Sequence, residues 1–217
     1  MVMMVSETRT ADRIKQAAES VSQEDGVAFL EHVHESWTEV SKALSRSIIL
    51  YLLVVALFEL LVGNKEDLRF TVAGFQFVNS ATLQKCLPAL AGYLYYESVM
   101  QMCRWLDCEQ AFDLFYKKFH EPLYGQGMHL LLKPSGGVWN IGTKYSGHST
   151  AGKLGAAAQA VVGYLCLIVI PVIFLGHASY LLIDRYGWSD PLTVVSFTLS
   201  SAFLLFGIVF SQFWRSS

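Results

Sequence analysis

Residues 192–213 read LTVVSFTLSSAFLLFGIVFSQF, a run of 22 residues without a single charged side chain. A charge-free apolar stretch of about 18 residues or more is typical of a helix that crosses a lipid bilayer. Water solvates such a segment poorly, whereas the hydrocarbon interior of a bilayer accepts it. This stretch therefore predicts a membrane-spanning helix, and it guides the interpretation of the other apolar segments.

Three further apolar segments precede it, at residues 48–62, 87–106 and 154–183. As a helix the first of them rises only about 22 Å, so it needs a further turn from residues 43–47 or a locally thinned bilayer. The third contains Pro171, which removes one helical hydrogen bond and predicts a kink. We predict an all-α integral membrane protein, a bundle of four transmembrane helices with cytoplasmic amphipathic helices.

The sequence between these spans differs in character from them. The first 47 residues carry 13 of the 34 charged groups and predict an amphipathic cytoplasmic arm. Residues 64–85 join the first two spans, and the β-branched and aromatic run at 69–78 predicts a short extended segment on the other side of the membrane. An amphipathic helix and a Gly-rich loop follow the second span. The expected domains are 1–47, 48–106, 107–153 and 154–217.

Lys and Arg are unequally divided between the two sides of such a bundle. Four crossings place the arm, the middle loop and the C-terminal tail together, with 12 Lys and Arg against 4 on the other side. Positive residues near helix ends favour the cytoplasmic side. We therefore expect both termini in the cytoplasm, and the expected location is the inner (plasma) membrane of a bacterium.

The second span carries a polar stripe. Tyr93, Glu97, Gln101 and Arg104 recur at steps of three or four residues, so they share one face of a helix. An ionised group at mid-bilayer costs about 2.5–3.5 kcal/mol, so the stripe should face protein or water. It is either a ligand or ion pathway centred on Glu97, or a contact between helices that fixes the bundle. Glu59, near the end of the first span, either reaches the interface or joins this stripe.

The last two spans contain small residues at intervals of three or four. This spacing lets helix backbones approach closely and drives association in lipid, within one chain or between copies. The helix-association candidates are Ala156, Ala160, Gly163, Ser196, Ser200, Gly207 and Ser211. A chain of 217 residues with short and kinked spans builds a pore more economically as an oligomer, so we expect a homo-oligomer.

The N-terminal arm offers a different surface. Leu30, Val33 and Trp37 follow one another at steps of three and four, so they lie on one apolar face of a helix. We interpret this face as a docking surface for a cytoplasmic protein partner.

Several classes of function lack support. The net charge of −2 and the absence of a large basic cluster argue against nucleic acid as a partner. The four cysteines and the histidines form no metal-binding motif, so neither a metal nor a cofactor is expected. Residues 147–153 fit the start of a phosphate-binding loop, but Leu154 stands where Ser or Thr is required. We find no convergent set of catalytic residues, which disfavours an enzyme.

Two functions remain. The first is a small oligomeric membrane protein, a channel-like or membrane-perturbing effector with a polar seam on the second span. The alternative is a non-catalytic membrane sensor, anchor or partner subunit that recruits another protein through its cytoplasmic helices.

Overall fold

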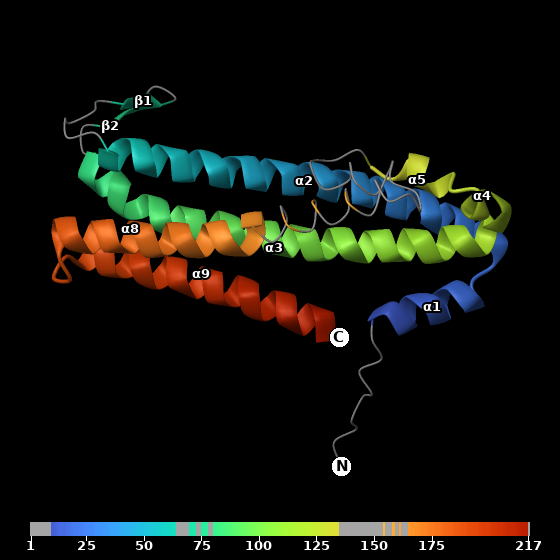
Figure 1. Cartoon of the computed structure of the whole chain (residues 1–217). Helices are drawn as coiled ribbons and strands as arrows, with labels where there is room; N and C mark the ends of the chain where they lie inside the picture. The colour runs from blue at the N-terminus through green and yellow to red at the C-terminus, as the bar shows by residue number, and fades with distance from the viewer. Residues whose placement is uncertain are drawn as a thin grey trace, which may run out of the picture. The chain divides into compact units, whose positions relative to one another are not determined.

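The computed structural model describes residues 10–63, 70–72, 75–77, 80–134, 154, 158, 161 and 165–216, and most of these are helical (Figure 1). The helices are α1 (Thr10–Ser20), α2 (Gln23–Gly63), α3 (Ser80–Phe119), α4 (Glu121–Gly125), α5 (His129–Leu132), α8 (Ile170–Tyr186) and α9 (Pro191–Ser216). The helical part of the fold prediction is confirmed. Among the described residues, two helices are long and apolar enough to cross a membrane, α2 and the Pro191–Ser211 part of α9. A bundle of four spans stays a prediction.

The two longest helices extend beyond the predicted spans. α2 has 41 residues and joins the predicted arm and first span without a break. The Ser22 hydroxyl accepts a hydrogen bond from the Asp25 backbone N–H (3.2 Å), as an N-cap residue does, and the helix ends at Gly63. α3 has 40 residues and tolerates Pro88 within its first turns. The apolar tracts are therefore parts of longer amphipathic helices.

The stretch expected to be extended and the segment before Pro171 both have local irregular structure, while a kink at Pro171 stays a prediction. β1 (Phe70–Val72) and β2 (Phe75–Phe77) form an antiparallel hairpin in which Phe70 pairs with Phe77, within the stretch expected to be extended. A π-helical turn, η2 (Leu165–Val169), comes directly before α8 and Pro171. π-helical turns commonly accompany disruptions of the regular helical hydrogen-bond ladder.

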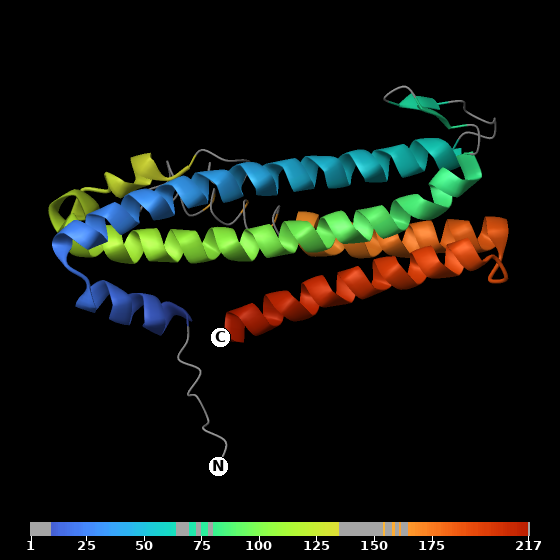
Figure 2. The same ribbon diagram turned by 180° about the vertical axis from the view of Figure 1, so that it is seen from behind.

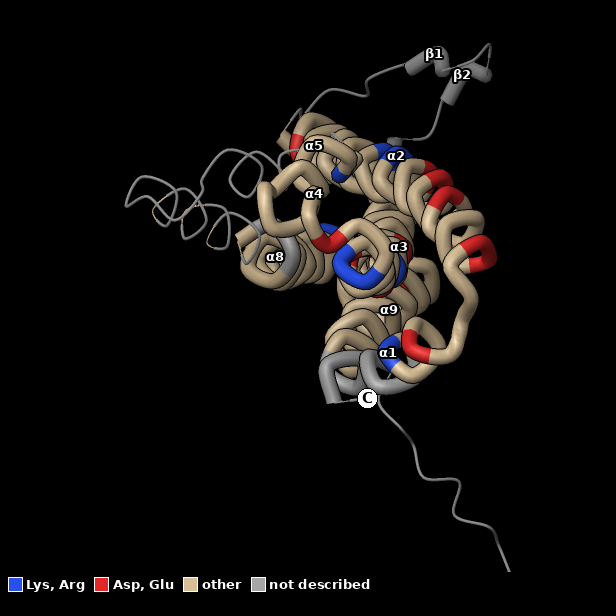
Figure 3. The backbone as a smooth tube through the Cα atoms, turned by 90° about the vertical axis from the view of Figure 1, so that its right-hand side faces the viewer, with Lys and Arg blue, Asp and Glu red and all other residues tan. Residues whose placement is uncertain are grey.

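The chain forms two compact units. Unit 1 comprises Met1–Ser45, Met100–Val161 and Phe210–Ser217, and unit 2 comprises Arg46–Val99 and Val162–Val209. α2 and α3 contribute to both, and in each unit they run side by side (Figures 1 and 2). Acidic positions follow one side of α2, the polar face of this amphipathic helix (Figure 3).

The core of unit 1 is aromatic and lies between α2 and α3. Its buried members are Ala18, Leu30, Val33, Trp37, Ala111, Phe112, Phe115 and Tyr116. The Trp37 ring centroid lies 5.6 Å from that of Trp105 and 5.4 Å from that of Phe112. The face predicted to dock a partner is therefore covered by the chain's own α3. Helical periodicity marks this face as apolar, but it does not show which element covers it.

In unit 2, α2 and α3 pack with α8 and α9. The rings of Tyr51 and Phe58 on α2 meet the Phe174 ring of α8 edge to face, at centroid distances of 6.5 and 5.4 Å. On the other side of α3, a Cβ added to Gly92 would lie 2.8 Å from Cα of Ser200. Only glycine at position 92 permits this close approach of α3 and α9.

Candidate functional site

The predicted polar stripe lies on the outer face of α3. The buried face of this helix includes Ala91, Tyr95 and Val99. At 3.6 residues per turn, Tyr93 and Glu97 point away from that face. Tyr93 is 45% exposed and Glu97 is partly exposed. Gln101, partly exposed, and Arg104, exposed, continue the same helical face in unit 1.

One edge of the stripe is flanked by α9. The rings of Tyr93 and Phe203 are in T-shaped contact at a centroid distance of 5.7 Å, and Tyr96 contacts the same phenylalanine at 6.0 Å. Tyr93 is thus a packing residue as well as part of the stripe.

Glu59 lies beside α8 rather than beside the stripe. Its Oε2 atom lies 3.5 Å from Nε2 of His177, and the two side chains are 47% and 48% exposed. We did not single out His177 from the sequence. The sequence contains one signal for this pair. Glu59 is the one acidic or basic side chain of residues 48–62, and His177 is the one acidic or basic side chain of residues 165–183.

A buried glutamine joins the ends of three helices in unit 2. The Gln84 side chain of α3 is hydrogen-bonded on both of its polar atoms. Its Nε2 donates to the Leu61 carbonyl of α2 (2.8 Å), and its Oε1 accepts from Arg185 (3.1 Å) and Tyr186 (2.8 Å) of α8. This network satisfies a polar group that is otherwise costly to bury.

An ion pair adds α9 to the same cluster. Lys85 Nζ lies 2.8 Å from Oδ1 of Asp190, and Asp190 also accepts hydrogen bonds from the backbone and hydroxyl of Thr193 as an N-cap. The hydrogen bonds from Lys85 and then Thr193 lower the pKa of Asp190 to about 2. The bonds of Lys85 and Arg185 show that this cluster connects the ends of the helices.

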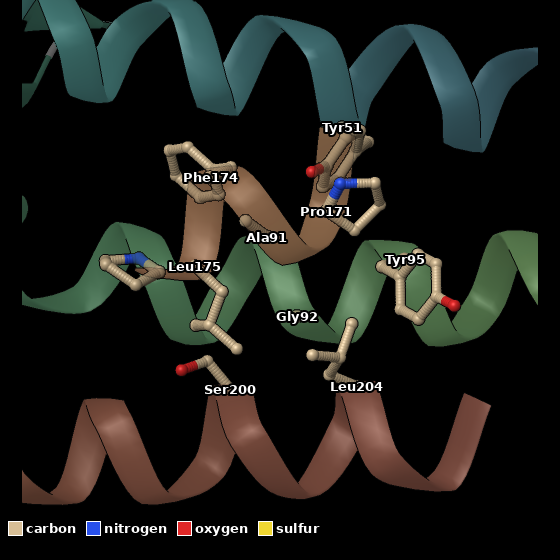
Figure 4. A pocket seen from close by; sticks show the side chains of 10 residues that line it. Tyr51, Ala91, Gly92, Tyr95, Pro171, Phe174, Leu175, Ser200 and Leu204 are labelled. Carbon is tan, nitrogen blue, oxygen red and sulfur yellow. The ribbon is translucent and has the colours of Figure 1, made fainter. Parts of the chain in front are cut away.

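The described helices of unit 2 surround a small cavity. A cavity of about 10 Å³ lies between its helices (Figure 4). Its lining comes from all four: Tyr51, Pro88, Ala91, Gly92, Tyr95, Pro171, Phe174, Leu175, Ser200 and Leu204. Such a volume holds about one water molecule at most. The cavity therefore provides no passage for a solute.

The small residues of α9 pack within the chain. Ser196 and Ser200 are buried, and a Cβ added to Gly207 would lie 2.8 Å from the Tyr95 ring. Ser211 is partly exposed. Three other association candidates, Ala156, Ala160 and Gly163, lie outside the described residues.

In unit 1 a buried lysine attaches the end of α5 to α3. Lys133 Nζ lies 2.7 Å from Oε1 of Glu109 and 3.1 Å from Oδ2 of Asp113. Burial alone would lower the pKa of Lys133, but the hydrogen bond and charge of Glu109, followed by those of Asp113, raise it above its ordinary value. We missed this clamp because the sequence does not show which loop lysine reaches these carboxylates.

Within the described residues, no three His, Cys, Asp or Glu side chains are grouped to hold a metal ion. No protein-family model matches the chain, and no curated protein or solved structure matches it.

Proposed function

We propose that this chain is a small polytopic membrane protein that acts as an oligomer, a channel-like or membrane-perturbing effector with polar groups between its copies. The observation that carries the proposal is the position of the polar stripe, on the outer face of α3 where the residues between Tyr93 and Arg104 are otherwise mostly apolar.

The outer surface of unit 2 suits lipid. Leu53, Ile173, Leu205 and Phe206 are each 59–64% exposed, and further apolar side chains around them are exposed as well. A soluble monomer rarely exposes a contiguous apolar area of this kind. This surface favours membrane insertion of α8 together with α2 and α9, and the proposed arrangement adds α3 as the fourth span.

In that setting, the stripe favours contact with another chain. Glu97 is partly exposed on the outer face of α3. Polar surface that faces lipid is costly, and a neighbouring copy would cover the exposed part of the stripe. Because the cavity between the described helices of unit 2 holds about one water molecule at most, we place the polar pathway between copies rather than through one copy. Gln101 and Arg104 would extend the polar seam formed around Glu97 between copies. Glu59 would be a second polar side chain on the outer surface.

The test is a conductance measurement on full-length protein reconstituted in vesicles. The double variant Glu97→Ala with Arg104→Ala should lower the conductance at least about tenfold, if the polar seam supplies about 1.4 kcal/mol or more to ion passage. A matched control is Glu39→Ala with Lys42→Ala, which removes an exposed acid and an exposed base from α2. Unchanged conductance in the first variant, or an exclusively monomeric protein in nanodiscs, would reject the proposal.

A second candidate is the anchor or partner subunit, and the α4–α5 segment favours it. Leu123, Met128, Leu131 and Leu132 are between 42% and 66% exposed there. These residues form an exposed apolar surface, whereas the apolar face around Trp37 is buried against α3. In this function the segment docks a cytoplasmic protein.

Its test is copurification of a crosslinked partner from intact cells. Leu131→Glu with Leu132→Glu should abolish capture, whereas Gln126→Glu, a change at an exposed polar position of the same segment, should preserve it. Equal capture by both variants would contradict this function.

A further inference from the structure

The face of unit 2 formed by α2 and α8 carries an ionisable pair in apolar surroundings. Glu59 Oε2 and His177 Nε2 lie 3.5 Å apart, and about half of each side chain is exposed. Leu60, Ile173 and Tyr180, which follow the same helices, are 59%, 64% and 68% exposed. If unit 2 is embedded in lipid, as the proposed function requires, this pair is costly to leave against hydrocarbon.

A glycine beside the pair leaves the backbone of α8 accessible. Gly176 precedes His177, and a Cβ added to it would meet no atom within 4 Å. Ile173 and Tyr180 lie three residues before and four residues after this glycine, so the three share one face of α8. A small residue at such a position allows another helix to approach closely.

The acid–base chemistry of the pair identifies the occupant. An acid and a base side by side are self-complementary under a twofold axis, because each Glu59 can meet the His177 of the other copy. An anionic lipid headgroup would instead be repelled by Glu59. A second copy supplies both matching groups without requiring a different protein.

We propose that this face is a contact between two copies of the chain, related by a twofold axis beside Gly176, with Glu59 of each copy facing His177 of the other. This inference rests on the proposed membrane function and specifies which face the oligomer uses.

The first test is disulfide crosslinking in native membranes. All four cysteines, Cys86, Cys103, Cys108 and Cys166, are replaced by Ser in the full-length chain. Gly176→Cys is then added and the membranes are oxidised. A disulfide needs Cα atoms within about 7 Å, so a dimer band is expected only if the two glycines lie near the axis. Val195→Cys, at a 52% exposed position on α9, should give none.

The second test separates a pair between copies from the pair within one copy. In the Gly176→Cys background, Glu59→Ala and His177→Ala should each strongly reduce the dimer band. When these two variants are coexpressed, one copy retains His177 and the other Glu59. A mixed dimer regains one pair across the axis, so the crosslinked fraction should rise severalfold above either variant alone.

The inference is overturned if inserted Gly176→Cys protein does not crosslink, or if coexpression gives no recovery. These results are distinguishable from failure of the proposed function. Protein that conducts but does not crosslink at position 176 would reject only this interface. Protein that crosslinks there but does not conduct would reject only the channel-like role.

Discussion

Trp37→Ala should destabilise unit 1 by about 3–5 kcal/mol, the usual cost of truncating a buried tryptophan. Trp37 is fully buried. Its ring contacts Trp105 and Phe112, and Lys133 Nζ lies 5.8 Å from the ring centroid. The truncation would leave a void between α2 and α3. It would also remove the ring over which Lys133, at the end of α5, lies.

The change is measurable as faster hydrogen exchange at the unit 1 amides of the detergent-solubilised protein. Trp188→Ala is the matched control, because Trp188 is 62% exposed and its removal leaves no interior void. Similar exchange in the two variants would contradict the assigned core.

Trp37→Phe refines this prediction. Within the described part of the chain, the indole N–H of Trp37 has no hydrogen-bond partner, although it is buried. Phenylalanine keeps much of the apolar volume and removes this unpaired donor, so it should cost much less than alanine.

Local signals in the sequence predict several elements. A charge-free tract predicts α9, and an aromatic, β-branched run predicts the hairpin region. The partner of each face requires long-range information. The spacing of Leu30, Val33 and Trp37 marks a buried face correctly, but an intramolecular core and a docking surface produce the same spacing.

The same distinction applies to the polar groups. Their spacing places Tyr93 and Glu97 on one face of α3. In a chain with apolar residues all round its helices, spacing does not tell whether that face points inward or outward. The pairing of Glu59 with His177 joins residues far apart in sequence, so it depends on the packing of α2 against α8.

Gly92→Leu should separate α3 from α9 and lower the thermal stability of unit 2 strongly. The nearest atoms to an added Cβ are Cα and the carbonyl O of Ser200, at 2.8 and 3.1 Å. Both belong to the backbone, so a change of rotamer cannot relieve the clash. Overpacking a filled interior typically costs about 1–3 kcal/mol, and a full leucine at a backbone contact should reach or exceed that range.

A minimal pair isolates this effect from helix propensity. Gly92→Ala adds only the clashing Cβ and should still lower the thermal midpoint. Gly63→Ala makes the same chemical change where no atom lies within 4 Å, so it should be neutral or slightly stabilising. Ser200→Gly should not rescue Gly92→Ala, because it removes neither of the two nearest atoms. If Gly92→Leu left unit 2 as stable as the unmodified chain, Ser200 would not pack against α3. The small residues of α9 would then be available for contacts between copies.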